Sequence, residues 1–289
     1  MVKLDRLDRS ETFIMGNRLL CDCHVHSNHS RDAEHSVTDL CKQAVSMGIF
    51  SLTITDHCEC NEYRTGGYNR TIRESICEVK QLQNKVKDKL TLLCGIELGQ
   101  PLQDLGAAED ALSIKGLDFV LASVHSIDNR KDYYFMKYQE DTVVSILEEY
   151  FDEIIRVIDW GKFDSLAHLT YPLRYILKNS GIKVNLHQFS GQIDIILKKL
   201  IEKEKALEIN TSGLRQGLGS VLPALEIVSR FKELGGKYIT IGSDAHRTSD
   251  LAAGILEGFE IAHQAGFSHF TIYCNRKPML FPFLKPENV

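Results

Sequence analysis

The sequence lacks the features that mark membrane, secreted and nucleic-acid-binding proteins. No apolar run approaches the roughly 18 residues that a membrane-spanning helix needs. The first twenty residues, MVKLDRLDRSETFIMGNRLL, carry charges of both signs and contain no apolar stretch as long as the core of a signal peptide. Acidic residues outnumber basic ones by 39 to 34, a net charge of −5, whereas nucleic-acid and anionic-membrane partners favour a basic surface. We therefore expect a cytoplasmic protein with no nucleic-acid and no membrane partner.

The chain is also poor in segments that divide a protein into domains. It has only six prolines in 289 residues, and we find no repeat, low-complexity segment or Pro/Gly-rich linker. Hydrophobic residues make up 43% of the chain, enough for a large core. Although this length allows two domains, α/β barrels of similar size often form one, and we expect a single domain.

Eight cysteines are present, but their spacing does not indicate a disulfide scaffold or a zinc knuckle. The pairs Cys21-x-Cys23 and Cys58-x-Cys60 lack the two-residue gap of zinc knuckles and thioredoxin motifs. Disulfide scaffolds are typical of much smaller secreted domains. The cysteines are therefore expected to be free thiols.

One motif suggests cysteine chemistry. The stretch HCECNEYRT, residues 57–65, matches the His-Cys-x5-Arg-Thr pattern of phosphatases that attack with a thiolate, here Cys58. Such a loop cradles the phosphate with backbone N–H groups and usually needs glycine, but this loop has none. It also contains Glu59 and Glu62, which repel an anion. We expect these two to be solvated loop carboxylates, with recognition of a cationic substrate as the alternative. We expect His57, as a metal ligand, and not the Cys58 thiolate, to carry the function of the stretch.

A short apolar run followed by a longer helical pattern recurs along the chain. The runs are nearly continuous, which is typical of strands buried on both faces of a parallel sheet. Between them apolar residues recur at helical spacing; one such pattern opens at Ser36 and ends at Gly48. Seven or eight βα units predict a closed α/β barrel, with a doubly wound sheet as the alternative. The strand-like runs are 18–24, 51–57, 91–97, 119–125, 164–170, 206–212, 238–244 and 269–274.

Polar side chains stand at the C-terminal ends of these runs, which meet on one face of a barrel. His24 and His26 are spaced i, i+2, as are Asp244 and His246, so each pair projects to one side of an extended segment. Imidazoles and carboxylates without cysteine suit Zn²⁺, Mn²⁺ or Fe, and we predict a metal site there. The strand-end residues are Asp22, His24, His26, His57, Glu97, His125, His168, Asn210, Arg215, Asp244 and His246.

The residues beside these histidines have other expected positions. Cys21 and Cys23 have the opposite parity and are expected to face the helices. Asp22 and Asp56 either orient imidazoles or cap loops, and the sequence leaves both interpretations open.

At these residues the sequence resembles the PHP (polymerase and histidinol phosphatase) family, and within it the histidinol-phosphate phosphatases. The resemblance implies a distorted (β/α)7 TIM-like barrel over residues 19–289, preceded by an extension at 1–18. The motifs that carry it are DCHVHS (22–27) with Asp32 after it, TDH (55–57), GIE (95–97), SVH (123–125), AHL (167–169), LEINTSGLR (207–215) and GSDAH (242–246).

The resemblance also implies a centre of three divalent metal ions. The ligands it implies are His24, His26, Glu97 and Asp244 for the first ion, Glu97, His125 and His168 for the second, and Asp32, His57 and His246 for the third. Arg174, in HLTYPLR, and Arg215, in NTSGLR, match the family's phosphate-binding arginines. Pattern reasoning alone neither finds Arg174 nor divides the ligands among three ions.

The implied activity is hydrolysis of L-histidinol phosphate in histidine biosynthesis, by a metal-bridging hydroxide that attacks phosphorus in line. Asp244 or His246 would arrange protonation of the leaving oxygen. Two other hypotheses remain: a family member acting on a nucleotide, an oligonucleotide 3′ end or a phosphotyrosine, and a metal-binding regulatory module without catalysis. The expected partner is a small-molecule phosphate ester; the sequence leaves the native metal and the oligomeric state open.

Overall fold

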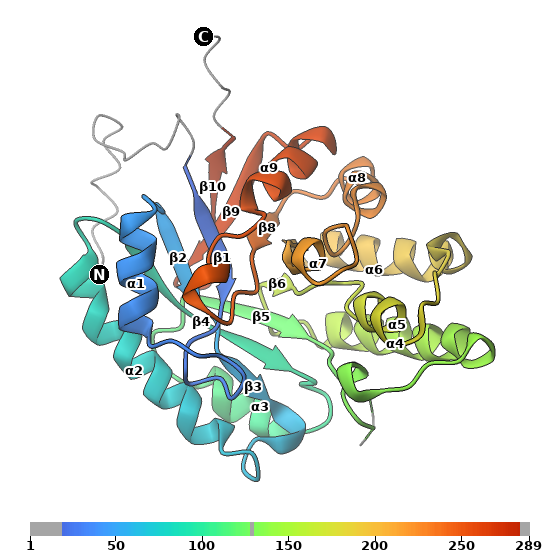
Figure 1. Cartoon of the computed structure of the whole chain (residues 1–289), viewed down its shortest axis with the longest axis horizontal. Helices are drawn as coiled ribbons and strands as arrows, with labels where there is room; N and C mark the ends of the chain where they lie inside the picture. Colours follow the sequence, from blue (N-terminus) through green and yellow to red (C-terminus); the bar gives the residue numbers. More distant parts are fainter. Residues whose placement is uncertain (1–18, 128–129, 284–289) are drawn as a thin grey trace.

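A computed structural model describes residues 19–127 and 130–283 of the chain. Its main sheet consists of parallel strands in the order β1-β2-β4-β5-β6-β7-β8, and β3 pairs with the C-terminal half of β4 (Figure 1). Residues 1–18, which we take as an extension, lie outside the described residues. The strands are β1 (Cys21–Val25), β2 (Ser51–Ile54), β3 (His57–Glu59), β4 (Thr91–Gly99), β5 (Phe119–Ser123), β6 (Ser165–Leu166), β7 (Ala206–Asn210) and β8 (Ile239–Gly242).

The sheet curls until its first and last strands meet. Asp244 N donates to His24 O at 2.8 Å, His26 N donates to Ala245 O at 2.9 Å, and Val25 forms a parallel bridge with Ala245. Since β3 continues the line of β2, seven strand positions surround the centre. The predicted single-domain (β/α)7 barrel is confirmed, and the doubly wound alternative is wrong.

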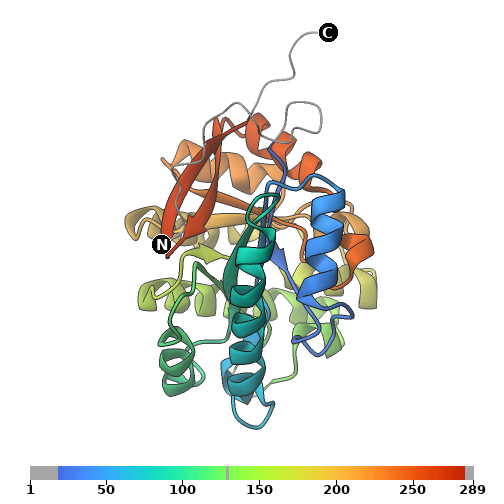
Figure 2. The ribbon, with the colours of Figure 1, turned by 90° about the vertical axis from the view of Figure 1, so that its left-hand side faces the viewer.

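Helices cover the outside of this barrel, and Figure 2 shows α1 and α2 side by side along one flank. In α1, Ser36 Oγ accepts a hydrogen bond from Asp39 N at 3.2 Å, and Gly48 follows the helix with a φ of +68°. The predicted start and stop signals of this helix are therefore confirmed. The helices are α1 (Val37–Ser46), α2 (Tyr68–Val86), α3 (Leu105–Leu112), α4 (Glu140–Trp160), α5 (Pro172–Ser180), α6 (Ser190–Glu202), α7 (Ser212–Arg215), α8 (Leu225–Glu233) and α9 (Ile255–Gln264).

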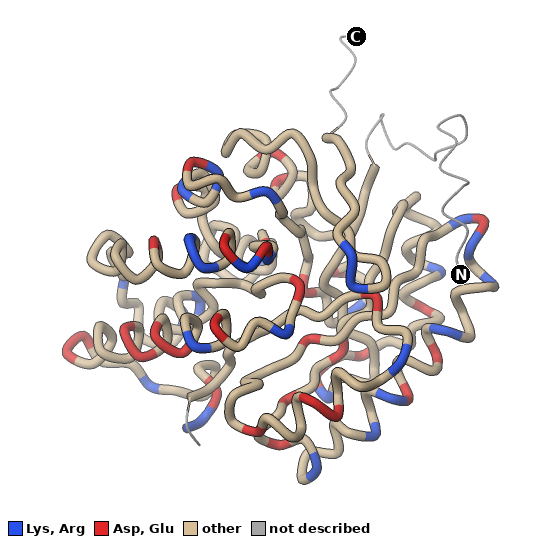
Figure 3. The backbone as a smooth tube through the Cα atoms, turned by 180° about the vertical axis from the view of Figure 1, so that it is seen from behind, with Lys and Arg blue, Asp and Glu red and all other residues tan. Residues whose placement is uncertain are grey.

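The outer helices carry the charges of both signs. Figure 3 shows basic and acidic residues interspersed along the helices seen from behind. Within the described residues, no helix is both long and apolar enough to cross a membrane.

The last strand-like run does not join the barrel. β9 (His269–Cys274) pairs antiparallel with β10 (Lys277–Pro282) as a hairpin. Tyr273 of this hairpin packs with Phe119, Leu121 and Ala206, and its ring stacks on that of Phe119 with centroids 5.3 Å apart. Leu121 pairs with Glu97 across the sheet, and such partners share a face. Tyr273 therefore fills the interior of the barrel beneath the Glu97 carboxylate.

Replacing Tyr273 with Ala is expected to lower the free energy of unfolding by about 3–5 kcal/mol, because it leaves a cavity inside the barrel. Tyr273→Phe is the control: it removes only the hydroxyl, which donates to Asp164 O at 3.2 Å, and should cost about 1 kcal/mol. Urea unfolding followed by circular dichroism measures both. Equal small losses for the two variants would contradict this packing role.

Candidate metal centre

The C-terminal ends of the strands bring the predicted site residues together. His24 lies on β1, His57 on β3 and Glu97 on β4. The other residues of the site follow β1, β5, β6 and β8 or lie on α5 and α7. All eleven side chains predicted for the site belong to one continuous set of contacts: His24, His26, Asp32, His57, Glu97, His125, His168, Arg174, Arg215, Asp244 and His246.

A β-bulge in β1 aims His24 and His26 into the barrel. Asp22 pairs with Leu52 and Val25 with Ile54, so β1 has one residue more than β2 over this span. The expectation that Cys23 faces the helices is wrong, because the extra residue changes its side: Cys23 Sγ lies 3.9 Å from Thr271 O of β9.

Two site residues have backbones in the left-handed half of conformational space. The φ of His168 is +21° and that of Asp244 is +55°. Non-glycine residues rarely adopt such values unless surrounding contacts fix them. The backbone N–H of Asp244 is held by His24 O, and that of His168 is held by the Glu208 carboxylate at 2.7 Å.

The first group of donor atoms comprises His24 Nε2, His26 Nε2, Glu97 Oε2 and Asp244 Oδ1. The two imidazole nitrogens are 3.0 Å apart, and each lies 3.6 Å from Glu97 Oε2. Asp244 Oδ1 lies 3.7 Å from His24 Nε2 and 3.4 Å from His26 Nε2. With metal–ligand bonds of about 2.0–2.2 Å, the ligand atoms of a tetrahedral site lie about 3.3–3.6 Å apart. The donor atoms of His24, His26 and Glu97 all lie within 4.8 Å of one another and suit one ion, and Asp244 Oδ1 stands beside the two histidines.

The second group shares Glu97 with the first. Its other oxygen, Oε1, lies 2.9 Å from His168 Nε2 and 3.1 Å from His125 Nε2, and these two nitrogens are 3.5 Å apart. The Glu97 carboxylate therefore has one oxygen in each group, which is the arrangement of a bridging ligand.

The third group lies nearest the solvent. Asp32 Oδ2 is 3.2 Å from His246 Nε2, and Asp32 Oδ1 is 3.6 Å from His57 Nε2. The Asp32 side chain is 60% exposed. His26 also stands against this group, with ring centroids 4.2 Å from His57 and 4.3 Å from His246.

The chemistry of these donors fits divalent cations. Glu97 Oε2 is buried and lies 2.8 Å from His57 Nδ1 and 3.6 Å from both His24 Nε2 and His26 Nε2, so nitrogen donors from three imidazoles surround one carboxylate oxygen, a donor set that suits divalent cations. Burial alone raises the pKa of the Glu97 carboxyl, but His125, His24 and His57 lower it more, so this pKa lies well below its ordinary value. Glu97 is therefore an anion surrounded by nitrogen donors.

Two carboxylates that sequence reasoning did not place in the site stand behind these donors. Glu208 Oε1 lies 2.7 Å from His24 Nδ1. Glu59 Oε1 lies 3.0 Å from His125 Nδ1, and the Glu59 side chain is only 14% exposed. The expectation of a solvated loop carboxylate is wrong for Glu59, which lies on β3, but holds for Glu62, whose side chain is 55% exposed.

Asp22 and Asp56 cap loops, which confirms one of the two interpretations left open for them. Asp22 accepts hydrogen bonds from Ser243 N and Ala252 N, both at 2.9 Å. Asp56 accepts from Ser27 N and Ser30 Oγ, both at 2.7 Å. Ser30 Oγ in turn lies 3.2 Å from His26 Nδ1, so Asp56 acts on an imidazole only through this serine.

Arg174 lies beside the first group of donors. Its Nη1 donates to Ser212 Oγ at 2.7 Å and to Asp244 Oδ2 at 3.3 Å. The guanidinium stands over the ring of Tyr171, 4.4 Å from its centroid. Burial lowers the pKa of Arg174, but Tyr175 and Asp244 raise it further, above its ordinary value. Arg174 is therefore a fixed cation.

Arg215 holds the loop that follows β8. Its Nη1 and Nη2 donate to Ser243 O and Asp244 O, both at 2.6 Å. A guanidinium has five N–H groups, so others remain available for a ligand.

The structure does not support a thiolate nucleophile. Cys58 is fully buried on the side of β3 opposite to His57 and Glu59, whereas Arg64 is exposed. A hydrogen bond with the Cys60 thiol and burial raise the pKa of Cys58 well above its ordinary value. The Cys58 thiol is therefore protonated and inaccessible.

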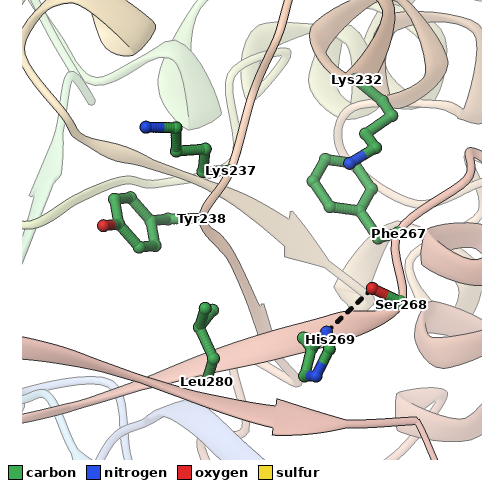
Figure 4. Close-up of a pocket in the computed structure, with 7 residues that line it drawn as sticks. All are labelled: Lys232, Lys237, Tyr238, Phe267, Ser268, His269 and Leu280. Carbon is green, nitrogen blue, oxygen red and sulfur yellow. Dashed lines mark hydrogen bonds between the residues drawn. The ribbon is translucent and has the colours of Figure 1, made fainter.

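A separate pocket of about 230 Å³ lies between α8, β8 and the β9–β10 hairpin (Figure 4). Lys232, Lys237 and His269 line it together with Tyr238, which directly precedes β8. This places the pocket at the N-terminal ends of the strands, away from the metal centre.

Comparisons with known proteins agree with this geometry. A family model described as the PHP domain matches residues 22–212. A probable histidinol-phosphatase of Thermotoga maritima is 30% identical over 256 residues, which cover 88% of this chain and 95% of the relative. A histidinol-phosphatase of Lactococcus lactis is 28% identical, with 89% and 95% covered. The crystal structure of histidinol phosphate phosphatase from Lactococcus lactis, complexed with Zn, L-histidinol and phosphate, matches with a TM-score of 0.74 and 25% identity, covering 90% of this chain and 99% of that one.

Proposed function

Because this chain belongs to the PHP domain family, we propose that it hydrolyses L-histidinol phosphate to L-histidinol and phosphate. The single observation that carries the proposal is the cluster of three donor groups, two of them joined by Glu97, with Arg174 and Arg215 beside it. The relatives named above cover almost the whole chain, and one of them was crystallised with both products of this reaction.

We assign one divalent ion, Zn²⁺, Mn²⁺ or Fe, to each donor group. When bound, the ions would lower the pKa of a coordinated water and neutralise charge on the phosphoryl oxygens. The assigned ligands are His24, His26, Glu97 and Asp244 for the first ion, Glu97, His125 and His168 for the second, and Asp32, His57 and His246 for the third.

The chain's own residues would bind and orient the phosphate ester. Arg174 is held by Ser212 and Asp244, and its buried Nε has no hydrogen-bond partner. We assign this N–H to a phosphoryl oxygen, since fixed donors aimed at developing charge need no reorganisation during the reaction. Arg215 would supply a second cation while keeping the Asp244 loop in place.

The proton that a bound water loses on forming hydroxide would pass to the leaving alkoxide, and we assign its placement to Asp244 or His246. Asp244 Oδ1 and His246 Nδ1 are 3.6 Å apart, at the border between the first and third donor groups. His246 Nδ1 also lies 3.0 Å from Asp244 O. A donated Nδ1 proton leaves Nε2 free to face Asp32.

The proposal includes a cytoplasmic location. All eight cysteines lie within the described residues, and none of them forms a disulfide. Free thiols suit a reducing compartment.

The test is phosphate release by purified protein loaded with Zn²⁺, Mn²⁺ or Fe²⁺. L-histidinol phosphate is compared with a mononucleotide, an oligonucleotide carrying a 3′ phosphate, and phosphotyrosine. We expect the highest kcat/KM for L-histidinol phosphate. Faster turnover of another ester would overturn the substrate assignment, and no turnover of any ester with all sites loaded would favour a regulatory module.

A further inference from the structure

Glu208, at the centre of β7, is a buried acid between the apolar residues Leu207 and Ile209, and only 1% of its surface is exposed. Burying a carboxylate costs several kcal/mol unless good partners compensate it. Glu208 shares its face of the barrel with Asn210, and its side chain lies below the metal centre rather than among the ligand atoms.

Every group that faces the Glu208 carboxylate can donate a hydrogen bond to it. Oε1 lies 2.7 Å from His24 Nδ1. Oε2 accepts from the backbone N–H of His168 at 2.7 Å and from Asn210 Nδ2 at 3.2 Å. One carboxylate therefore contacts residues from two different donor groups.

The contact with His24 orients a ligand of the first ion site, and the contact with His168 orients a ligand of the second. A proton on His24 Nδ1, donated to Glu208, leaves the Nε2 lone pair directed at the first ion. The bond to His168 N holds a backbone whose φ of +21° is unusual for histidine, and that backbone aims His168 Nε2 at Glu97 Oε1. Among the residues that the structure describes, the hydrogen bonds of the Glu208 carboxylate reach no member of the third group.

We infer that Glu208 is a positioning residue that orients His24 and His168 together and so couples the first and second ion sites. The inference rests on the proposed metal-dependent function, but it concerns metal binding and not the identity of the substrate. It predicts that a change at Glu208 weakens two ions of the three and spares the third.

Glu208→Gln tests the inference most directly because glutamine has the size of glutamate. Its amide NH2 must face either His24 Nδ1–H or His168 N–H, so one hydrogen bond is lost and two N–H donors face each other. Glu208→Asp keeps the charge but is one methylene too short to reach both partners. Asp118→Asn is the matched control: Asp118 is a buried carboxylate that accepts from Cys94 N at 3.0 Å and Asn275 N at 2.9 Å, away from the centre.

The experiment titrates the metal-free full-length proteins with Zn²⁺ in competition with a chromophoric chelator, and with Co²⁺ followed by its visible absorption. We expect Glu208→Gln to bind two ions about 10–100-fold more weakly than wild type, with a changed Co²⁺ spectrum, while one ion binds as before. Glu208→Asp should fall between the two. Asp118→Asn should bind all ions as wild type does.

The melting temperature of each metal-free protein shows whether Glu208 contributes only to the stability of the fold. If Glu208→Gln melts lower yet binds all its ions with affinities within about threefold of wild type, the inference is overturned. If Glu208→Gln does not fold, wild-type affinity in Glu208→Asp overturns it. Wild-type protein that binds no metal overturns it as well, whereas tight metal binding without turnover of L-histidinol phosphate contradicts only the proposed substrate.

Discussion

Replacing Glu97 with Gln is expected to lower kcat for L-histidinol phosphate by roughly 10³-fold or more. Glu97 is the one side chain with an oxygen in each of two donor groups, and an amide supplies only one good oxygen ligand and no negative charge. Five imidazoles face this carboxylate within 3.6 Å, so its loss also leaves neighbouring cations without their counter-charge.

The measurement is steady-state kinetics combined with metal analysis of the purified variant. We expect fewer bound ions per chain than in the wild type. Glu109→Gln is the control, because Glu109 pairs with Lys162 on the surface, where both side chains are more than half exposed. If Glu97→Gln keeps more than about a tenth of wild-type kcat, the bridging role is wrong.

The second large effect is expected at Arg174. Replacement by Ala should lower kcat/KM by about 10²–10³-fold, the range for loss of one fixed donor at developing charge. The variant loses a buried cation 3.3 Å from Asp244 Oδ2 and a donor to Ser212 Oγ. Arg174→Lys should recover only part of the activity, because an ammonium group cannot reproduce the planar fork.

Lys178→Ala is the matched control for Arg174. Lys178 lies one turn further along α5 and is exposed, and its Nζ stands over the ring of Tyr134, 5.9 Å from the centroid. Kinetics on both variants, with metal content measured in parallel, separate phosphate binding from metal loss. Arg174→Ala with full metal content and unchanged kcat/KM would show that this guanidinium does not contact the transition state.

Most of the barrel could be predicted from the sequence because each strand is a buried run followed by a polar residue. His125 and His168, for example, have no second ligand two residues away, yet their place at the ends of buried runs predicts where they lie. The hairpin formed by β9 and β10 was not foreseen. A single apolar run such as residues 269–274 does not tell whether its strand joins a parallel sheet or an antiparallel pair.

The parts of the site that sequence reasoning missed depend on the backbone. Glu208 sits inside an apolar run, and only its shared parity with Asn210 and its position on β7 signal that it faces the barrel interior. The sequence predicts a loop at Glu59, because nothing in it shows that the strand resumes after Asp56 as β3. The bulge in β1 changes the side of Cys23, and a one-residue shift of this kind is invisible in a pattern of period two. Arg174 came only from the family resemblance.

The central claim is that cations held by this donor cluster, and not a thiolate, support the reaction. Phosphate release from L-histidinol phosphate, measured before chelation, after exhaustive chelation and after metal is restored, tests it most directly when Cys58→Ser is measured beside the wild type. We predict that chelation abolishes activity in both proteins, that restored metal recovers it, and that folded Cys58→Ser matches the wild type. Full activity after chelation, together with an inactive but folded Cys58→Ser, would contradict the account.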